Sequence, residues 1–304
     1  NASQSDYKVN PVYKGNYTET MTAAIAAFRA KQQPHIVQVF EVGTATMMSA
    51  KGAVYPVYKL MADTKEPFDP KAYLASVTGY YTDTDGNMLS MPFNSSTPVL
   101  YYNKDLFKKA GLDPEKAPKT WQEVEAAAKA VQAAGATCGF TTGWQSWVQL
   151  ENFSAWHNVP FGTKENGFAG LDTEFSFNSP THVKHIAQLG EWQKSKIFDY
   201  GGRRSDSAPK FYTQECAMYM NSSAAYAGVK ANAKDFEFGV GQLPYWDGVA
   251  GAPQNSIIGG ATLWVLAGHE TEEYKGVARF FSFLSSAEIQ ADWHQFTGYL
   301  PITH

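Results

Sequence analysis

The sequence predicts an α/β protein built from two domains. Strand-like and helix-like patterns alternate along the chain, which is typical of sheets covered by helices. With 304 residues, the chain exceeds the length at which one hydrophobic core stays efficient. Hydrophobic residues make up 44% of the chain and charged residues 18%, an ordinary globular composition with enough apolar side chains for two cores.

The first hundred residues contain short strand patterns and one well-marked helix. Three short strands are predicted: Val9–Val12, His35–Phe40 and Met88–Met91. Asn16 and Glu19 have the spacing of a capping box, which predicts a helix over Tyr17–Lys31. The apolar strand before Glu41 is of the buried type, so a carboxylate at its end needs a partner or a function.

Longer helices follow Asn103. Three are expected: from Thr120 to about Ala134, over Thr181–Lys194, and from a cap in Ser285–Glu288 to Gly298. Thr120 and Glu123 form a second capping-box pattern, and Ser179 followed by Pro180 predicts an N-cap with proline at the first helical position.

Two crossings between the domains are expected, one near residues 96–100 and one near 253–260, where Asn255–Val265 returns to a strand through Gly259 and Gly260. Each crossing joins turn residues to a strand, so the expected connection is a β-type hinge. The predicted domains are residues 1–97 with 258–304, and residues 98–257.

Composition excludes several classes of protein. The formal net charge is −4, and no Lys/Arg-rich stripe is present, which argues against a nucleic-acid binder. No stretch approaches the ~20 apolar residues of a membrane span. Only four residues are arginine, at 29, 203, 204 and 279, so an anion site in this chain must rely on hydroxyls, backbone N–H groups or lysine.

The two cysteines, Cys138 and Cys216, both lie in short strand-like runs. They form no metal-binding spacing and are too few for a disulfide scaffold. If the two strands are neighbours, one bridge can form in an oxidising compartment, and two buried thiols are the alternative.

Enzyme signatures are missing from the sequence, which contains no GxSxG, HExxH, GxxxxGK[ST] or strand-linked GxGxxG pattern. His182 and His185 stand three apart on a predicted helix and have a spacing that could hold a metal, but an exposed helix face explains them better. His157 is a candidate for a cleft or, more simply, a loop residue. No metal site and no cofactor are therefore predicted.

Aromatic and hydroxyl side chains supply the candidate ligand contacts instead. Trp144 and Trp147 are three residues apart, so on a helical turn they would share a face that can stack a polyol or hold a quaternary ammonium group. Core packing is the alternative for both. Ser222 follows a predicted strand, where hydroxyl and free N–H groups could bind an anion or simply cap a helix.

Six segments, in order along nearly the whole chain, resemble the periplasmic sn-glycerol-3-phosphate-binding proteins of ABC importers. They are Tyr13–Tyr17, Gln38–Thr46, Phe93–Asp105, Gly143–Trp147, Gln149–Trp156 and Gly298–Thr303. The resemblance implies the fold of a type 2 periplasmic binding protein, like that of maltose-binding protein: two α/β lobes joined by a β-type hinge, with a ligand cleft between them. It also implies that segments at both ends of the family's chain, one carrying a phosphate-binding arginine, lie outside this sequence, which would then be a fragment.

The resemblance further implies a set of ligand-binding residues: Tyr17, Glu41, Ser96, Trp144, Trp147, Ser222, Gly260 and Tyr299. In this interpretation Glu41 accepts from the glycerol hydroxyls, and the tryptophans form an aromatic wall for glycerol carbons or choline. Hydrogen bonds to phosphate come from Ser96, Ser222, Tyr299 and the Gly260 N–H.

The expected function is capture of sn-glycerol 3-phosphate or glycerophosphodiesters such as glycerophosphocholine in the periplasm, followed by delivery to membrane permease subunits. The protein is expected to be a monomer without cofactors and without catalysis. Two alternatives remain: a binding protein of the same fold for a neutral oligosaccharide or polyol, and a hydrolase, which would need a metal cluster or carboxylate pair that the sequence does not show.

Overall fold

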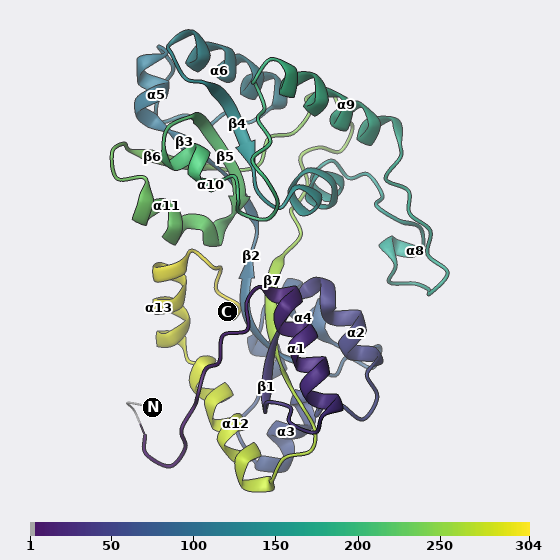
Figure 1. Ribbon diagram of the computed structural model, residues 1–304. Helices are drawn as coiled ribbons and strands as arrows, with labels where there is room; N and C mark the ends of the chain where they lie inside the picture. The colour runs from purple at the N-terminus through teal and green to yellow at the C-terminus, as the bar shows by residue number, and fades with distance from the viewer. Residues whose placement is uncertain (1–3) are drawn as a thin grey trace. The chain divides into compact units, whose positions relative to one another are not determined.

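The computed structural model describes residues 4–304 and divides them into two compact units (Figure 1). Unit 1 comprises the chain up to Ser96 together with Ile258–His304, and unit 2 comprises Thr97–Ile257. The domains predicted from the sequence begin and end within one residue of these units, apart from residues 1–3, which lie outside the described residues. Their role as ligand-binding lobes is taken up below as a proposal.

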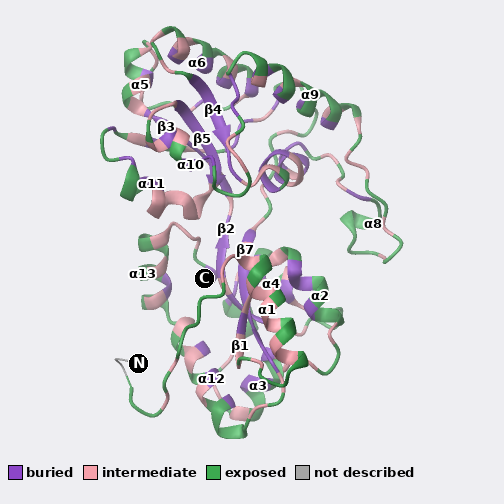
Figure 2. Ribbon diagram, in the orientation of Figure 1, coloured by how far each residue is buried: buried purple, intermediate pink, exposed green. Residues whose placement is uncertain are grey.

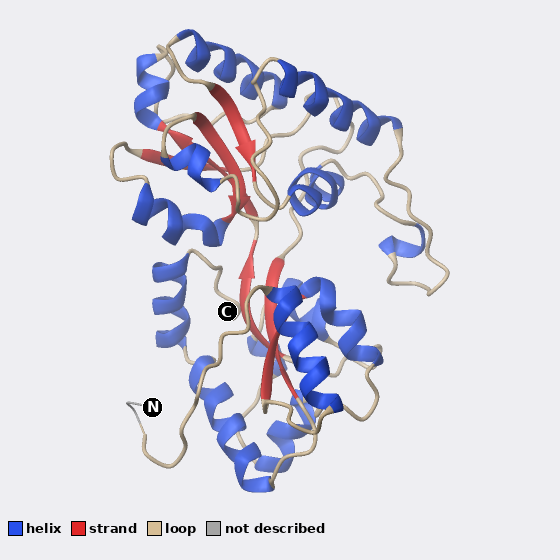
Figure 3. Cartoon of the chain, viewed as in Figure 1, coloured by secondary structure: helices blue, strands red, loops and turns tan. Residues whose placement is uncertain are grey.

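Unit 1 contains a three-stranded sheet in the order β1 (Ile36–Phe40), β7 (Gly259–Val265), β2 (Met91–Ser96), with β7 antiparallel to both neighbours. Its helices are α1 (Tyr17–Arg29), α2 (Thr44–Ser49), α3 (Val57–Thr64), α4 (Ala75–Tyr81), α12 (Thr271–Leu284) and α13 (Ala287–Thr297), with short 3₁₀ turns η1 (Glu41–Gly43) and η2 (Pro70–Ala72). Figure 3 shows these helices around the strands.

Alternating residues of β7 build two cores on opposite faces of the unit 1 sheet. Leu263 and Val265 pack in a cluster with residues of α3, α4 and α12. Trp264 packs on the other face, with Val37 and Val39 of β1 and partly buried residues of α1. Burial on both faces explains why the last three residues of this strand are all apolar, as expected for a sheet inside an α/β unit. The strands are mostly buried in Figure 2.

Unit 2 contains a four-stranded sheet in the order β4 (Cys138–Thr142), β5 (Cys216–Ser222), β3 (Pro98–Asn103), β6 (Phe238–Gly241). The β4–β5 pair is parallel, and β3 is antiparallel to both of its neighbours. The helices are α5 (Lys104–Lys109), α6 (Trp121–Ala133), α7 (Asn152–Trp156), α8 (Thr163–Asn166), α9 (Pro180–Lys194), α10 (Ala208–Tyr212) and α11 (Tyr226–Asn232), with a π-helical turn η3 (Trp147–Glu151) and a 3₁₀ turn η4 (Ser223–Ala225).

The unit 2 sheet also separates two cores. Leu100 and Tyr102 of β3 belong to the larger cluster, with residues of α6 and α9, whereas Tyr101 between them belongs to a smaller cluster with residues of α10 and α11. A disulfide bond joins Cys138 and Cys216, which are register partners on β4 and β5. The alternative of two buried thiols is therefore wrong, because the parallel pairing places the two Cα atoms 4.5 Å apart.

N-capping patterns in the sequence predicted the starts of three helices correctly. Asn16 and Glu19 form a reciprocal capping box, as do Thr120 and Glu123. Ser179 caps α9 through a bond to the His182 N–H, with Pro180 at the first helical position. These interactions lie within four residues of one another, so the sequence pattern alone determines them.

Three predicted features are wrong. Residues 9–12 form no strand in the described chain, and Val12 is exposed, so apolar residues there have no sheet to join. The strand predicted at Met88–Met91 instead starts at Met91, and Met88 makes only a single bridge to Thr82. Ser286 precedes α13 without a side-chain cap, and the hydroxyl of Ser285 bonds to the Phe281 carbonyl at 2.8 Å instead.

Candidate ligand-binding residues

In unit 1, Tyr17 lies within a network of polar side chains. The cap at Asn16 makes Tyr17 the first residue of α1, and its ring stacks on Phe40 at the end of β1, with centroids 5.3 Å apart. The Asn94 amide Nδ2 donates to the Tyr17 hydroxyl at 3.1 Å, and Gln38 Nε2 donates to Asn94 Oδ1 at 2.9 Å. A helix start and two strands thus hold this hydroxyl in place.

The environment of Tyr17 keeps its phenol protonated. Burial is the main cause that raises the pKa of Tyr17 above its ordinary value, and a hydrogen bond with Tyr299 and the charge of Glu41 raise it further. The bond from Asn94 acts in the opposite direction but is outweighed. A phenol that cannot ionise near neutral pH can donate a hydrogen bond to an anion.

Glu41 is close to the same group of phenols. It is the first residue of η1, directly after β1, and is half-buried. Its backbone carbonyl accepts a hydrogen bond from the Tyr80 hydroxyl at 3.2 Å. Its charge contributes to the raised pKa of both Tyr17 and Tyr81, which shows that the carboxylate lies near both rings.

Ser96 and Gly260 lie on paired strands of the unit 1 sheet, where Ser96 faces Gly259 and Ser95 faces Gly260 in the register. Gly260 has φ +113°, and a Cβ there would come 1.9 Å from the Asn94 carbonyl oxygen. Only glycine fits at position 260, because β2 approaches so closely. This requirement holds whether or not the Gly260 N–H contacts a ligand. The buried Ser95 hydroxyl has no hydrogen-bond partner among residues 4–304.

Tyr299 follows the end of α13, which the left-handed residue Gly298 terminates as predicted. Its ring stacks on Trp293 with the planes 1° apart, and the next residue, Leu300, donates its N–H to the Ser95 carbonyl at 2.8 Å. The structure thus brings Tyr299 next to Tyr17 and beside β2. All five candidates in unit 1 belong to neighbouring elements: Tyr17, Glu41, Ser96, Gly260 and Tyr299.

In unit 2, Trp144 and Ser222 follow two adjacent strands. Gly143 donates its N–H to the Met220 carbonyl at 2.8 Å, so the carboxyl ends of the parallel strands β4 and β5 meet there. Trp144 has φ +45° and donates its N–H to the Arg204 carbonyl at 2.8 Å. The carboxyl ends of parallel strands are where α/β proteins commonly place ligand contacts.

The two tryptophans do not share a helical face as the spacing suggested. Trp144 precedes the helix in a left-handed conformation, and only Trp147 lies within it, at the start of η3. Trp147 is 8% exposed and belongs to the larger core of unit 2, and its Nε1 has no partner among the described residues. Trp144 is only partly buried against this core, which makes it the more accessible ring.

Ser222 acts as a cap in the structure. Its hydroxyl accepts the Ala224 N–H at 3.0 Å, and its carbonyl accepts the Tyr101 hydroxyl at 3.0 Å. The capping interpretation is thus confirmed, and an anion-binding role for the same residue stays a prediction. The two roles are compatible, because a hydroxyl that accepts one bond can still donate another.

The histidines singled out in the sequence are buried in unit 2. His182 and His185 are 1% and 0% exposed, so the expectation of an exposed helix face is wrong. Both ring nitrogens of each are occupied: His182 contacts the hydroxyls of Ser179 and Ser154, and His185 contacts Gln149 and the indole N–H of Trp246. These contacts leave neither ring a free nitrogen for a metal.

His157 is a core residue rather than part of a loop. Its Nδ1 donates to the Phe153 carbonyl and its Nε2 accepts the Trp246 backbone N–H, both at 2.8 Å. Burial lowers the pKa of His157 to about 4 and, together with the neighbouring histidines, that of His185 to about 3. Both rings are therefore neutral at physiological pH.

Sequence reasoning did not single out Asn94 and Gln38, which hold the Tyr17 hydroxyl. A signal was present for each. Gln38 is a polar residue between Val37 and Val39 of a buried strand, and Asn94 opens the polar run before Pro98. A buried amide needs partners, so either residue predicts a polar network at the sheet.

Comparisons with known proteins identify the family of the chain. The family model described as "Bacterial extracellular solute-binding protein" matches residues 1–304. The sn-glycerol-3-phosphate-binding periplasmic protein UgpB of Salmonella typhimurium is 55% identical over 304 residues, which are all of this chain and 69% of that protein. The resemblance predicted from the sequence is confirmed.

Solved structures share the fold. UgpB from Mycobacterium tuberculosis in complex with glycerophosphocholine aligns with a TM-score of 0.78 and 24% identity, covering 95% of this chain and 70% of that one. Maltose-bound MalE3 of T. maritima aligns with a TM-score of 0.75 and 19% identity, covering 94% and 71%. The predicted fold class, that of the maltose-binding-protein-like solute-binding proteins, is confirmed.

Within residues 4–304, every helix is too short or too polar to cross a membrane. The matched relatives are binding proteins, so the chain is a binding protein and not an enzyme. From its match along every residue, the chain belongs to the family of bacterial extracellular solute-binding proteins.

Proposed function

We propose that the chain captures sn-glycerol 3-phosphate, and glycerophosphodiesters such as glycerophosphocholine, in the periplasm and delivers them to the permease subunits of an ABC importer. The observation that carries this proposal is the 55% identity, over all 304 residues, to a protein named for binding sn-glycerol 3-phosphate there. A structure with 24% identity and the same fold holds glycerophosphocholine, which supports the diester as a second ligand.

The chemistry of unit 1 suits a phosphorylated polyol. The protonated Tyr17 and the neighbouring Tyr299 can donate to phosphate oxygens, and Glu41 can accept from glycerol hydroxyls. The unpartnered hydroxyl of Ser95 adds a donor on β2, next to Ser96. Hydroxyl donors allow anion binding in a chain with four arginines.

Unit 2 supplies a complementary set in this proposal. The partly buried Trp144 offers a ring face to glycerol carbons or to choline, an attraction of about 0.5–2 kcal/mol for a quaternary ammonium group. Ser222 and the backbone at the start of η4 offer donors to phosphate. In this proposal units 1 and 2 are the two lobes that close on the ligand, and Trp147 and Gly260 complete the set of contacts.

Isothermal titration calorimetry on the complete protein tests the proposal, with sn-glycerol 3-phosphate, glycerophosphocholine and maltose as separate ligands. We expect one site for at least one of the two phosphate esters and no measurable heat for maltose. Trp144→Ala should weaken glycerophosphocholine more than glycerol 3-phosphate, because only the diester carries a quaternary ammonium group. Absence of binding for both phosphate esters would overturn the ligand assignment.

A neutral oligosaccharide or polyol is the second candidate, because maltose-bound MalE3 has the same fold. Ser222→Trp separates the two. The bulky ring should abolish phosphate ester binding if Ser222 donates to phosphate, and the matched variant Ser146→Trp, at an exposed position, should leave it unchanged. Tight maltose binding that survives Ser222→Trp would favour the oligosaccharide.

A further inference from the structure

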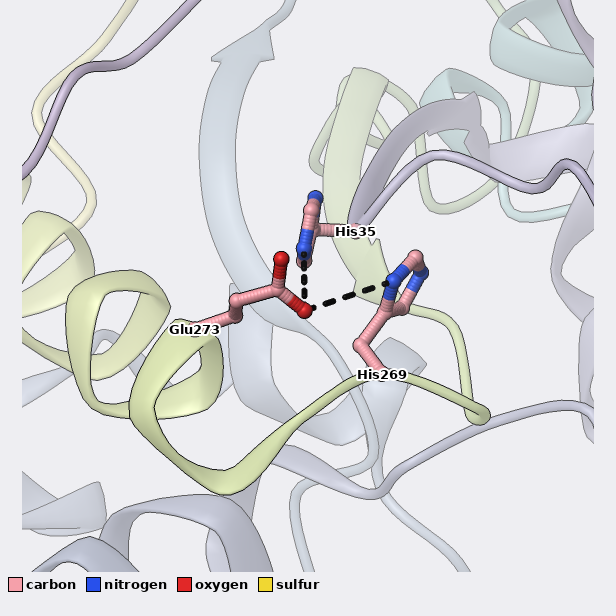
Figure 4. A group of neighbouring side chains, drawn as sticks. All are labelled: His35, His269 and Glu273. Atoms are coloured by element: carbon pink, nitrogen blue, oxygen red, sulfur yellow. Dashed lines mark ion pairs between the residues drawn. The ribbon is translucent and has the colours of Figure 1, made fainter.

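Unit 1 contains a group of histidine and carboxylate side chains outside the candidate ligand-binding residues. His35 precedes β1, His269 lies in the loop between β7 and α12, and Glu273 lies in the first turn of α12 (Figure 4). One ligand atom from each of these side chains lies within 4.8 Å of the others. In Figure 4, dashed lines join one nitrogen of each ring to the same Glu273 carboxylate oxygen.

The sheet positions the two histidines close together although they are distant in sequence. His35 directly precedes Ile36, which pairs with Val265, and the His35 carbonyl accepts the Leu266 N–H at 2.9 Å. The Tyr274 hydroxyl accepts the His269 N–H at 3.1 Å and donates to the Leu266 carbonyl at 2.8 Å. Both histidine backbones are therefore held by regular structure.

A hydrogen bond to the backbone orients the His269 ring. His269 Nε2 lies 3.2 Å from the Pro34 carbonyl, an acceptor only, so this nitrogen carries the proton in the neutral ring. The lone pair is then on Nδ1, which lies 3.9 Å from Glu273 Oε2. A histidine that donates its second N–H to a backbone carbonyl is the usual arrangement of a metal ligand.

The other two groups already contact each other. His35 Nε2 lies 3.3 Å from Glu273 Oε2. The same carboxylate oxygen accepts the Glu270 N–H at 3.0 Å in the capping box of α12, which limits its movement. The imidazole rings stack with centroids 3.8 Å apart.

We propose that His35, His269 and Glu273 bind a divalent transition metal ion of the zinc class, with water completing its coordination. Two imidazoles and a carboxylate form a donor set that suits zinc, and ligands about 2.0–2.2 Å from a tetrahedral ion are about 3.4 Å apart. The distance of 3.3 Å from His35 Nε2 to Glu273 Oε2 already fits this value. The distance of 3.9 Å from His269 Nδ1 to the same oxygen must shorten by roughly half an ångström.

The group lies partly at the surface. The side chains of His35, His269 and Glu273 are 40%, 14% and 48% exposed, whereas the His35 Nε2 atom itself is buried. A bound ion would strengthen the link between the loop before β1 and the start of α12, which already meet through the His35–Glu273 contact and the stacked histidine rings. The site would thus cross-link unit 1.

Calorimetry on the chelator-treated complete protein tests the proposal, with Zn²⁺ as the titrant at pH 7.5. We expect one equivalent to bind, and Co²⁺ to bind in its place with a visible absorption band typical of imidazole and carboxylate ligands. Zn²⁺ at a hundredfold excess over Kd should raise Tm by about 3–6 °C.

Variants locate the ion. His35→Gln, His269→Gln and Glu273→Gln should each weaken Zn²⁺ binding at least tenfold and remove the Tm rise. Two matched controls, His304→Gln and Glu288→Gln, should bind as the parent does, because His304 is an exposed histidine elsewhere and Glu288 is an exposed acid in the first turn of α13.

Two results would overturn the proposal. One is the absence of both Zn²⁺ heat and Co²⁺ absorption in the parent protein. The other is binding that persists in His269→Gln at the parent's affinity, which would place the ion elsewhere. Far-ultraviolet circular dichroism and binding of sn-glycerol 3-phosphate by each variant distinguish a lost site from a lost fold.

Discussion

The two units place their histidines in opposite environments. In unit 2, His157, His182 and His185 are buried, and all their ring nitrogens are hydrogen-bonded within the core. In unit 1, His35 and His269 stand near the surface with Glu273. The comparison shows that the same side chain serves as a neutral structural link in the core of one unit and lies beside a carboxylate near the surface of the other.

The cysteines follow the same division, since both belong to unit 2. The largest expected difference between the units therefore comes from the disulfide. The double change Cys138→Ala with Cys216→Ala opens a loop with a sequence separation of 78 residues and should cost unit 2 roughly 4–5 kcal/mol of unfolding free energy in the chain-entropy model.

Hydrogen exchange measured by mass spectrometry can test this prediction unit by unit. Protection should decrease in β4 and β5 and stay unchanged in β1 and β7. The double variant should no longer respond to a reducing agent, which serves as its control. Equal loss of protection in both units would contradict the division between them.

The stability of unit 1 depends instead on the close approach of the β7 backbone at Gly260 to the β2 backbone at Asn94. Gly260→Val should cost about 3 kcal/mol or more of unfolding free energy, because the added Cβ would collide with the Asn94 carbonyl and the backbone is at φ +113°. The matched control is Gly79→Ala in α4, where a Cβ has open space, and it should stabilise slightly. Urea unfolding of both variants measures the difference, and a Gly260→Val chain as stable as the parent would refute it.

Acid should destabilise unit 2 before unit 1. The pKa of His157 is lowered to about 4 from an ordinary value near 6.5, so the unfolded chain binds the proton more readily. The stability that this neutral ring provides is complete above pH 6.5 and is lost as the pH falls toward 4. Between pH 7.5 and pH 5 the loss from His157 alone is about 2 kcal/mol.

Tryptophan fluorescence during urea unfolding reports mainly on unit 2 and can measure this loss. His157→Gln should reduce the pH dependence, since an amide keeps one donor and one acceptor without titrating in this range. The titration of Asp199 does not affect this measurement. Burial alone would raise its pKa, but hydrogen bonds from Lys196, Lys210 and Gln193 lower it to about 2, so its contribution is lost only at more acidic pH. An unchanged slope in the variant would exclude His157 as the source.

The smallest predicted effect concerns the polar network of unit 1. Tyr17→Phe removes the hydroxyl that bonds to Asn94 and Tyr299, and should weaken sn-glycerol 3-phosphate binding about tenfold, or roughly 1.4 kcal/mol. Tyr58→Phe, at an exposed tyrosine of α3, is the matched control and should bind as the parent does. Calorimetry gives both values, and equal affinities would remove Tyr17 from the site.

Sequence patterns were sufficient where the interaction is local. The caps at Asn16, Thr120 and Ser179 depend on residues three positions apart, and all three formed as predicted. Apolar runs also located β1 and the end of β7, because a buried strand in an α/β protein needs such a run whatever its neighbours are.

Patterns failed where strand pairing decides the outcome. The cysteine bridge depends on the register of β4 against β5, which neither strand specifies alone. Trp144 was expected on a helical face, but its left-handed backbone is set by the Arg204 carbonyl, far along the chain. His35, His269 and Glu273 could not be grouped from spacing, because only the β1–β7 pairing brings them together.

The disulfide bond between β4 and β5 also has a consequence for the newly synthesised chain. Thiols remain reduced in the bacterial cytoplasm, so a newly made chain lacks this covalent tie until it meets an oxidising compartment. Unit 2 is therefore easier to unfold before export than afterwards, because the disulfide bond has not yet formed. The added stability of the bond is therefore present only after the chain has reached an oxidising compartment.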